Sequence, residues 1–350
     1  MSVTCNGKMR ILIAGGAGFI GSNLAEKLLN LGHKVDCIDN LITGQRQNIA
    51  ACEISPRFEF VPGDICDIDF MARFNGIPYN AIYNLACPTG VPNIAKFGEE
   101  MLMTSSVGNL NLLKLANLSG AKFLYASSAE VYGDPAITPQ SEVYFGDVNP
   151  VGPRSAYEEA KRFGESLTKH FSTMHAVDAR IIRIFNTYGP KMSLRETRVI
   201  PQLLRNMILK VPVTLYGDGS NTRSFQFVDD LLAGFEASMN VICAGDVFNI
   251  GGEHEISMLE LFRNCQRVAE YNEEPVFKEH FIEDHRRRRP ETKKIRELGW
   301  KPKVQLIEGL GVCHKELSGR LLTQPIPFVR PQKIAPFKNR RVIYERRTSA

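Results

Sequence analysis

The chain has 350 residues, 43% of them hydrophobic, so it can bury a substantial core in one large domain or two smaller ones. It lacks the apolar run of about 18 residues that a membrane span needs, and its short polar start does not resemble a signal peptide, so we expect a cytoplasmic protein. The net charge is +5, but residues 320–350 hold eight basic residues and one acid. The excess positive charge therefore belongs to this tail and does not indicate a nucleic-acid-binding domain. The eight cysteines are scattered without zinc-type spacing, so no metal site is predicted.

Short apolar runs and helical patterns alternate through the first two thirds of the chain. Runs typical of buried strands occupy residues 9–14, 35–38, 58–61, 81–85, 123–126 and 179–184. The helical patterns between them include residues 23–31, 109–118 and 157–171. This alternation predicts an α/β fold with a Rossmann-type, doubly wound parallel sheet.

Prolines interrupt the pattern beyond about Gly189. Strand-like runs return at residues 213–216 and 247–250, followed by a helical pattern at 257–269. We therefore expect a smaller C-terminal lobe. The predicted boundaries are 1–188 for the sheet domain with its long helix, 189–318 mainly for the lobe, and 319–350 for a basic, extended tail.

Three glycines, Gly15, Gly18 and Gly21, follow the first predicted strand and open the first predicted helix. In a dinucleotide-binding turn the first glycine makes the tight bend, the second admits the pyrophosphate and the third lets helix pack on strand. Asp39 ends the second predicted strand, where a carboxylate can bind the adenosine ribose and repel a 2′-phosphate. The pattern predicts NAD, while Arg46, seven residues further on, leaves NADP open.

Tyr157 and Lys161 lie four residues apart in a predicted helix, so their side chains share one face. A phenol has an unperturbed pKa of about 10, and a neighbouring cation can make it a usable base. The pair therefore suits proton removal from a sugar hydroxyl while a nicotinamide takes the hydride. Because this spacing is common on solvated helices, it predicts a catalytic pair only together with the glycine motif.

Further motifs occur in the order found in extended short-chain dehydrogenases/reductases that act on nucleotide sugars, and the chain resembles this family over residues 10–317. The motifs are Gly-Asp-Ile at 63–65, Asn-Leu-Ala at 84–86, Ser-Ser-Ala-Glu-Val-Tyr-Gly at 127–133, Ile-Phe-Asn-Thr-Tyr-Gly-Pro at 184–190 and Tyr-Gly-Asp-Gly at 216–219. The resemblance implies a homodimer packed through two helices per subunit. It also implies cofactor contacts from Gly15, Gly18, Phe19, Ile20, Gly21, Asp39, Asn40, Asp64, Ile65, Leu85, Ala86, Tyr157 and Lys161.

Within that family, several segments resemble the UDP-glucuronate decarboxylases. They are Ala-Cys-Pro at 86–88, Glu-Val-Tyr-Gly-Asp-Pro at 130–135, Asn-Pro-Val-Gly-Pro-Arg-Ser at 149–155, Thr-Arg-Ser-Phe-Gln at 222–226 and Arg-Arg-Arg-Pro at 287–290. The resemblance implies that Tyr157, with Lys161 and Ser128, oxidises the sugar at C4, that Glu130 acts in decarboxylation and protonation, and that Arg288 handles the carboxylate. The implied substrate contacts are Pro88, Glu130, Asn186, Arg198, Tyr216, Arg223 and Arg288.

Two departures from the decarboxylase pattern keep other reactions open. Ala129 stands where these decarboxylases usually carry serine and related 4,6-dehydratases carry aspartate. The segment 89–97 lacks an expected tyrosine, so either the sugar differs or Lys96 contacts the carboxylate. The alternatives are a 4-epimerase of a UDP-hexose or UDP-hexuronate, then a dehydratase, and lastly a catalytically silent sugar-nucleotide-binding protein.

Overall fold

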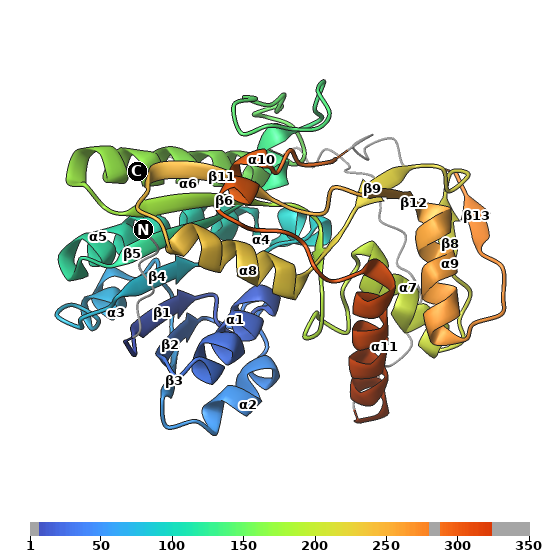
Figure 1. Ribbon diagram of the computed structural model, residues 1–350, viewed down its shortest axis with the longest axis horizontal. Coiled ribbons are helices and arrows are strands. Elements are labelled where there is room, and N and C mark those ends of the chain that lie inside the picture. Colours follow the sequence, from blue (N-terminus) through green and yellow to red (C-terminus); the bar gives the residue numbers. More distant parts are fainter. Residues whose placement is uncertain (1–6, 280–287, 324–350) are drawn as a thin grey trace, which may run out of the picture.

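A seven-stranded parallel sheet forms the centre of the larger part of the molecule. The computed structural model describes residues 7–279 and 288–323 (Figure 1). The strand order is β11-β6-β5-β4-β1-β2-β3, and every neighbouring pair is parallel. The bounds are β1 (Arg10–Ala14), β2 (Lys34–Asp39), β3 (Phe58–Pro62), β4 (Ala81–Asn84), β5 (Lys122–Ser128), β6 (Ala179–Ile184) and β11 (Ala244–Ile250). The predicted doubly wound sheet is confirmed.

Helices cover both faces of this sheet, which explains why its central strands β1, β4 and β5 are largely apolar and buried. Successive side chains of a strand point to opposite faces, so Ile11 and Ile13 join one hydrophobic core while Leu12 and Ala14 join the other. The first core includes α1 (Phe19–Asn30) and α8 (Val228–Met239), whereas the second includes α5 (Asn109–Ser119) and α6 (Ser155–His175). Smaller elements complete this part: η1 (Arg46–Ile49), α2 (Ala50–Glu53), α3 (Ile68–Ala72), α4 (Val91–Met103), the π-helix η2 (Thr104–Gly108), η3 (Ala129–Tyr132) and α10 (Lys293–Glu297).

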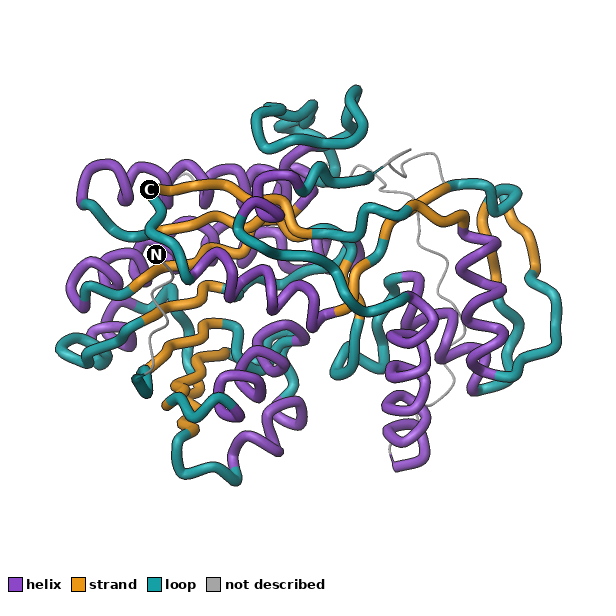
Figure 2. The backbone as a smooth tube through the Cα atoms, in the orientation of Figure 1, coloured by secondary structure: helices purple, strands orange, loops and turns teal. Residues whose placement is uncertain are grey.

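A smaller lobe lies beside the carboxyl ends of the strands, at the right of Figure 2. Its helices are α7 (Val199–Ile208), α9 (Met258–Ala269) and α11 (Leu306–Thr323). Its short strands form three pairs: β7 (Thr187–Tyr188) with β10 (Gln226–Phe227), β9 (Thr222–Ser224) with β12 (Glu255–Ser257), and β8 (Thr214–Tyr216) with β13 (Val276–Lys278). A cleft at this edge of a parallel sheet is the expected position for a ligand.

The lobe does not occupy one continuous stretch of sequence. Although α8 and β11 fall inside the predicted lobe at 189–318, β11 pairs with β6 and α8 packs in the same core as α1. The helix α11 continues to Thr323, past the predicted start of the tail at residue 319. The rest of that tail, 324–350, lies outside the described residues, as do Arg286 and Arg287. No helix in the described ranges is long and apolar enough to cross a membrane.

Candidate active site

The turn between β1 and α1 has room for glycine only. Gly15 has φ +80°, and a Cβ there would lie 2.8 Å from backbone atoms of Leu85 and Ala86. A Cβ on Gly21 would lie 2.1 Å from the carbonyl oxygen of Gly15. The helix N-terminus that follows can therefore approach a phosphate group closely, as the sequence pattern predicts.

A cavity of about 370 Å³ opens next to this turn. Eight of the predicted cofactor residues line it: Gly15, Gly18, Asp39, Asn40, Asp64, Ile65, Leu85 and Ala86. Pro88, predicted as a substrate contact, lines this cavity rather than the larger one described below. Phe19 and Gly21 line neither cavity; Phe19 lies under the guanidinium of Arg198, and Gly21 packs on Gly15.

Asp39 is held by the backbone at the end of β2. Its Oδ2 accepts the N–H of Ala17 at 2.9 Å and its Oδ1 accepts the N–H of Leu41 at 2.8 Å. Burial raises the pKa of the Asp39 carboxyl, and these two hydrogen bonds act in the opposite direction. Arg46, which left NADP open, instead donates to Glu53 at 2.9 Å and does not line the cavity.

A second cavity, of about 540 Å³, lies where the carboxyl ends of β5 and β6 meet the lobe. Leu85 lines both cavities, so they are neighbours. Predicted residues from both parts of the molecule line the second cavity, and they are Ile20, Ser128, Glu130, Tyr157, Lys161, Asn186, Arg198, Tyr216, Arg223 and Arg288. The structure thus brings together all five predicted catalytic side chains.

Tyr157 and Lys161 lie on α6 as the spacing indicates. Lys161 Nζ donates to the carbonyl oxygen of Ala126 at 2.8 Å and lies 5.9 Å from the centre of the Tyr157 ring. Desolvation raises the pKa of Tyr157, while its hydrogen bond with Ser128 and the charge of Arg198 act in the opposite direction. Desolvation therefore outweighs the lowering effects of Ser128 and Arg198, and the proposed role of Lys161 as the cation beside the phenol stays a prediction.

Glu130 lies between two arginines. Its Oε1 accepts from Arg288 Nη1 at 2.5 Å, and its Oε2 accepts from Arg154 Nη2 at 2.5 Å. Its backbone N–H donates to Ser128 Oγ at 3.3 Å, at the start of η3. Among the described residues, Arg288 Nη2 is buried and has no hydrogen-bond partner. One donor of this guanidinium is therefore available to a second acceptor in the cavity.

Arg154 is a site residue that the sequence analysis missed. It lines the larger cavity and caps the N-terminus of α6, where its carbonyl oxygen accepts the N–H of Tyr157 at 3.1 Å. The signal was its place in the segment 149–155, three residues before Tyr157. Nothing local in that segment indicates a contact with Glu130.

The two departures from the decarboxylase pattern have clear positions. Ala129 is 2% exposed, lines the larger cavity and packs in a small core with Val131, Tyr132 and Phe185. Lys96 is exposed, with its ammonium 4.6 Å from the centre of the Phe97 ring, and it does not line the cavity. The structure therefore gives no support to a carboxylate contact from Lys96.

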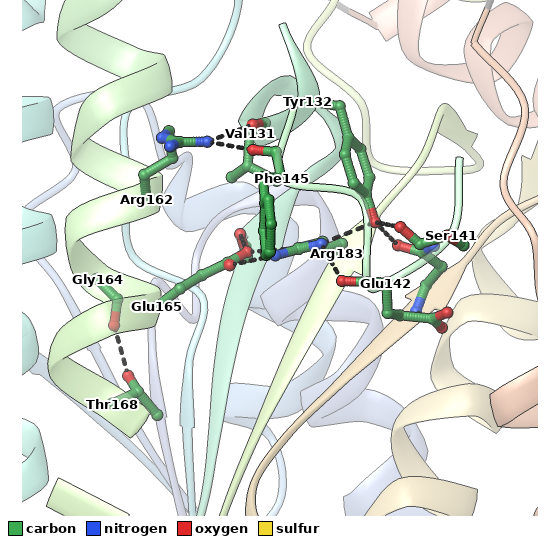
Figure 3. A network of polar contacts seen from close by, with 12 residues as sticks. Val131, Tyr132, Ser141, Glu142, Phe145, Arg162, Gly164, Glu165, Thr168 and Arg183 are labelled. Atoms are coloured by element: carbon green, nitrogen blue, oxygen red, sulfur yellow. Dashed lines mark hydrogen bonds and ion pairs between the residues drawn. The ribbon is translucent and has the colours of Figure 1, made fainter. Parts of the chain in front are cut away.

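A polar network behind the cavity connects α6, β5 and β6 (Figure 3). Arg183 donates through Nε and Nη2 to the two oxygens of Glu165, at 2.9 and 2.7 Å, and through Nη1 to Tyr132 Oη at 2.9 Å. Ser127 Oγ donates to the same carboxylate at 2.5 Å. These bonds fix the strand that ends at Ser128 against the helix that carries Tyr157.

No group of three potential metal ligands occurs within residues 7–279 and 288–323.

Three comparisons with known proteins agree with this architecture. A family profile described as GDP-mannose 4,6 dehydratase matches residues 12–311. UDP-glucuronic acid decarboxylase 1 of Arabidopsis thaliana is 40% identical over 318 residues, which cover 91% of this chain and 72% of the relative. A dTDP-glucose 4,6-dehydratase from Streptomyces venezuelae, solved with NAD, is 28% identical with a TM-score of 0.80, covering 91% of this chain and 99% of that one. The UDP-glucuronic acid 4-epimerase of Bacillus cereus, solved with NAD, is 27% identical with a TM-score of 0.76, covering 89% and 99%.

Proposed function

We propose that this chain, which belongs to the epimerase/dehydratase family of extended short-chain dehydrogenases/reductases, is an NAD-dependent enzyme that decarboxylates UDP-glucuronate to UDP-xylose. The relatives named as UDP-glucuronic acid decarboxylases support the substrate class. The carboxylate-binding character of the site, argued below, supports the reaction.

The smaller cavity would hold the adenosine and pyrophosphate part of NAD, and the neighbouring larger cavity, which Tyr157 lines, would hold the nicotinamide. Gly15 and Gly21 have no room for a Cβ in this turn, Gly18 lines the cavity where a pyrophosphate would lie, and Asp39 is fixed by two N–H groups beside it. NAD would accept a hydride from the sugar and return it after carbon dioxide has left, so no net oxidation occurs. Structural neighbours solved with NAD are consistent with this choice.

The observation that carries the proposal is the set of charges around the larger cavity. Its charged lining residues within the described part of the chain are one acid, Glu130, and five bases, which are Arg154, Lys161, Arg198, Arg223 and Arg288. A UDP-sugar brings a diphosphate, for which Asn186, Arg198 and Arg223 are the proposed partners. The two arginines on Glu130 remain, next to Tyr157. A neutral hexose needs no such pair, whereas a planar guanidinium with a free donor suits a sugar carboxylate.

The protein side chains divide the chemistry between them. Tyr157, oriented by its hydrogen bond with Ser128, takes the proton from the C4 hydroxyl, and Lys161, with Nζ 5.9 Å from the centre of the Tyr157 ring, places a positive charge near the phenolate. The 4-ketone is then β to the C6 carboxylate held by Arg288, so the electrons of the C5–C6 bond pass into an enolate as carbon dioxide leaves. Glu130, on the same side of the cavity, organises the proton that returns to C5.

Incubation of the purified protein with UDP-glucuronate tests this proposal directly. We expect release of carbon dioxide and a UDP-pentose product. A product of unchanged mass would instead identify a UDP-hexuronate 4-epimerase, the alternative that Ala129 favours because an epimerase needs no hydroxyl there. Protein without bound NAD and without turnover of any UDP-sugar would indicate a silent binder.

We also propose a homodimer that packs through α4 and α6. These helices pack on each other and leave large apolar side chains exposed, namely Leu102, Met103, Phe163 and Met174. A dimer would cover this surface and remove it from water. Sedimentation of the purified protein at micromolar concentration is the test.

A further inference from the structure

The segment that carries Arg288 belongs to no helix or named strand, so other residues must hold it in place. Ser224 Oγ donates to the carbonyl oxygen of Arg288 at 3.3 Å. Most of the hydrogen bonds that the rest of the protein makes with residues 289–291 come from Gln140. The position of the Arg288 side chain therefore depends on this glutamine.

Gln140 binds the segment through both its backbone and its side chain. Its N–H donates to the carbonyl oxygen of Arg289 at 2.9 Å, and its own carbonyl oxygen accepts the N–H of Glu291 at 2.7 Å. Its side-chain Oε1 accepts the N–H of Arg289 at 2.9 Å. Gln140 thus fixes the residue that immediately follows Arg288 from two sides.

Gln140 is itself held rigidly. It is 0% exposed and lines neither cavity, and its Nε2 donates to the carbonyl oxygen of Ile137 at 2.7 Å and to Thr138 Oγ1 at 3.2 Å. A buried amide whose donors and acceptor are all engaged has little freedom to turn.

The same glutamine is linked to the turn that carries Glu130. Tyr132 Oη, at the end of η3, donates to Asn249 Oδ1 at 2.8 Å, and Asn249 Nδ2 donates to the carbonyl oxygen of Gln140 at 3.0 Å. Both partners of the ion pair between Glu130 and Arg288 therefore come from segments joined through Asn249 and Gln140. The pair is positioned by a buried hydrogen-bond network as well as by its own charge.

We infer that Gln140 is a positioning residue for carboxylate recognition: it holds the Arg288 guanidinium where the sugar carboxylate binds. The inference rests on the proposed function, since it assigns the carboxylate to Arg288. Gln140 acts through Arg288 and contacts neither substrate nor cofactor. Its loss should therefore affect the sugar end of the substrate selectively.

A double-mutant cycle on the full-length protein with bound NAD tests this. Gln140→Met keeps the side-chain length but removes the acceptor for Arg289 and both donors. We expect kcat/KM for UDP-glucuronate to fall about tenfold or more while the Kd for UDP changes less than about twofold. In the background of Arg288→Ala, the same substitution should cost less than about threefold, because the residue it positions is gone.

Two controls separate positioning from damage to the fold. Ser238→Ala removes another hydrogen bond of a fully buried side chain, to the carbonyl of Phe235 in α8, and should leave UDP-glucuronate kinetics unchanged. Ser224→Ala removes only the bond to the Arg288 carbonyl oxygen and should also lower kcat/KM for UDP-glucuronate. It therefore tests the inference independently if Gln140→Met does not fold.

Hydrogen exchange provides an arm that needs no substrate. The amides of Arg289 and Glu291, whose N–H groups bind Gln140 in the wild type, should exchange faster in Gln140→Met, with no matching change in α8. Three results would overturn the inference. They are effects of the two substitutions on kcat/KM that multiply in the double variant, a loss of UDP affinity in Gln140→Met as large as the loss in kcat/KM, and unchanged amide exchange at Arg289 and Glu291. Absence of carbon dioxide release from the wild type would instead overturn the proposed function. The exchange measurement would still show whether Gln140 holds residues 288–291 in place.

Discussion

Arg288 Nη1 lies 2.5 Å from Glu130 Oε1, joining segments 158 positions apart in the chain. Both side chains are largely buried, at 12% and 14% exposure, so their attraction is weakly screened by solvent. The guanidinium proposed to bind the sugar carboxylate therefore also binds a carboxylate of the protein, through Nη1, while Nη2 has no hydrogen-bond partner among the residues that the structure describes. A sugar carboxylate that binds both nitrogens would compete with Glu130 for Nη1, and this competition leads to separable kinetic effects.

Replacement of Arg288 should affect acidic sugars selectively. Arg288→Ala removes the proposed carboxylate partner and leaves Glu130 with Arg154, so we expect kcat/KM for UDP-glucuronate to fall about 100-fold, or about 2.7 kcal/mol. Arg288→Lys retains the charge without the planar fork and should recover only part of this loss. Titration with UDP and UDP-glucose provides the control, since their affinities should stay within about twofold. Equal losses for UDP-glucose and UDP-glucuronate would show that Arg288 does not bind the carboxylate.

Glu130→Gln should separate binding from chemistry. The neutral amide no longer competes strongly for Arg288, so the Kd for UDP-glucuronate should not rise, whereas kcat should fall by about 100-fold or more if Glu130 organises the proton at C5. Equilibrium titration and steady-state kinetics on the same preparation measure both quantities. A Kd that rises as much as kcat falls would indicate that Glu130 acts mainly as a substrate contact.

Arg154→Gln should have the opposite signature. Arg154 Nη2 holds one oxygen of Glu130 at 2.5 Å, so the loss of Arg154 should strengthen the attraction between this carboxylate and Arg288. We expect KM for UDP-glucuronate to rise about tenfold with a smaller change in kcat. The double variant Glu130→Gln with Arg154→Gln should lose this rise in KM, because the competing carboxylate is absent. A KM that rises equally in both backgrounds would make Arg154 a direct substrate contact.

Tyr157→Phe should abolish oxidation at C4 while NAD remains bound, because only the hydroxyl is removed. In the wild type, desolvation raises the pKa of Tyr157, so the phenol is protonated at neutral pH and the reactive phenolate becomes more abundant as pH rises. Single-turnover reduction of bound NAD by UDP-glucuronate should therefore accelerate with pH between about 6 and 8. Stopped-flow absorbance of the reduced nicotinamide measures this rate. A variant with wild-type rates, or a rate independent of pH, would remove Tyr157 from the base role.

Much of the fold could be predicted because buried parallel strands are continuous apolar runs. Such runs can be recognised in a sequence without knowing which strands they pair with. The pairing of β11 with β6 was not predictable in this way, since it depends on a contact between distant parts of the chain. The strand predicted at residues 247–250 lies within β11, which belongs to the central sheet although its residues fall in the range predicted mainly for the lobe.

In the site, too, local sequence patterns were predictable and contacts between distant residues were not. Motif positions predicted that Ser128, Glu130, Tyr157 and Arg288 share a cavity, but not the contact between Arg154 and Glu130, which is 24 positions apart and follows no local pattern. The rise in the pKa of Tyr157 was not predictable from the sequence either, because desolvation depends on how the folded chain surrounds the phenol. Charge partners four residues apart are visible in a sequence, whereas burial is not.

Ala129→Ser tests the remaining departure from the decarboxylase pattern. Ala129 lines the cavity beside Glu130 but is only 2% exposed, so an added hydroxyl would be largely removed from water. Without a partner in the free protein it should lower the free energy of unfolding by about 1 to 2 kcal/mol. With UDP-glucuronate bound, the hydroxyl can donate to the carboxylate or its developing enolate, and we expect kcat to rise about three- to tenfold. Thermal unfolding and carbon dioxide release from the same variant measure the two effects, with Ala160→Ser on α6, also buried, as the stability control. A slower decarboxylation at unchanged C4 oxidation would show that this site is built to work without the hydroxyl.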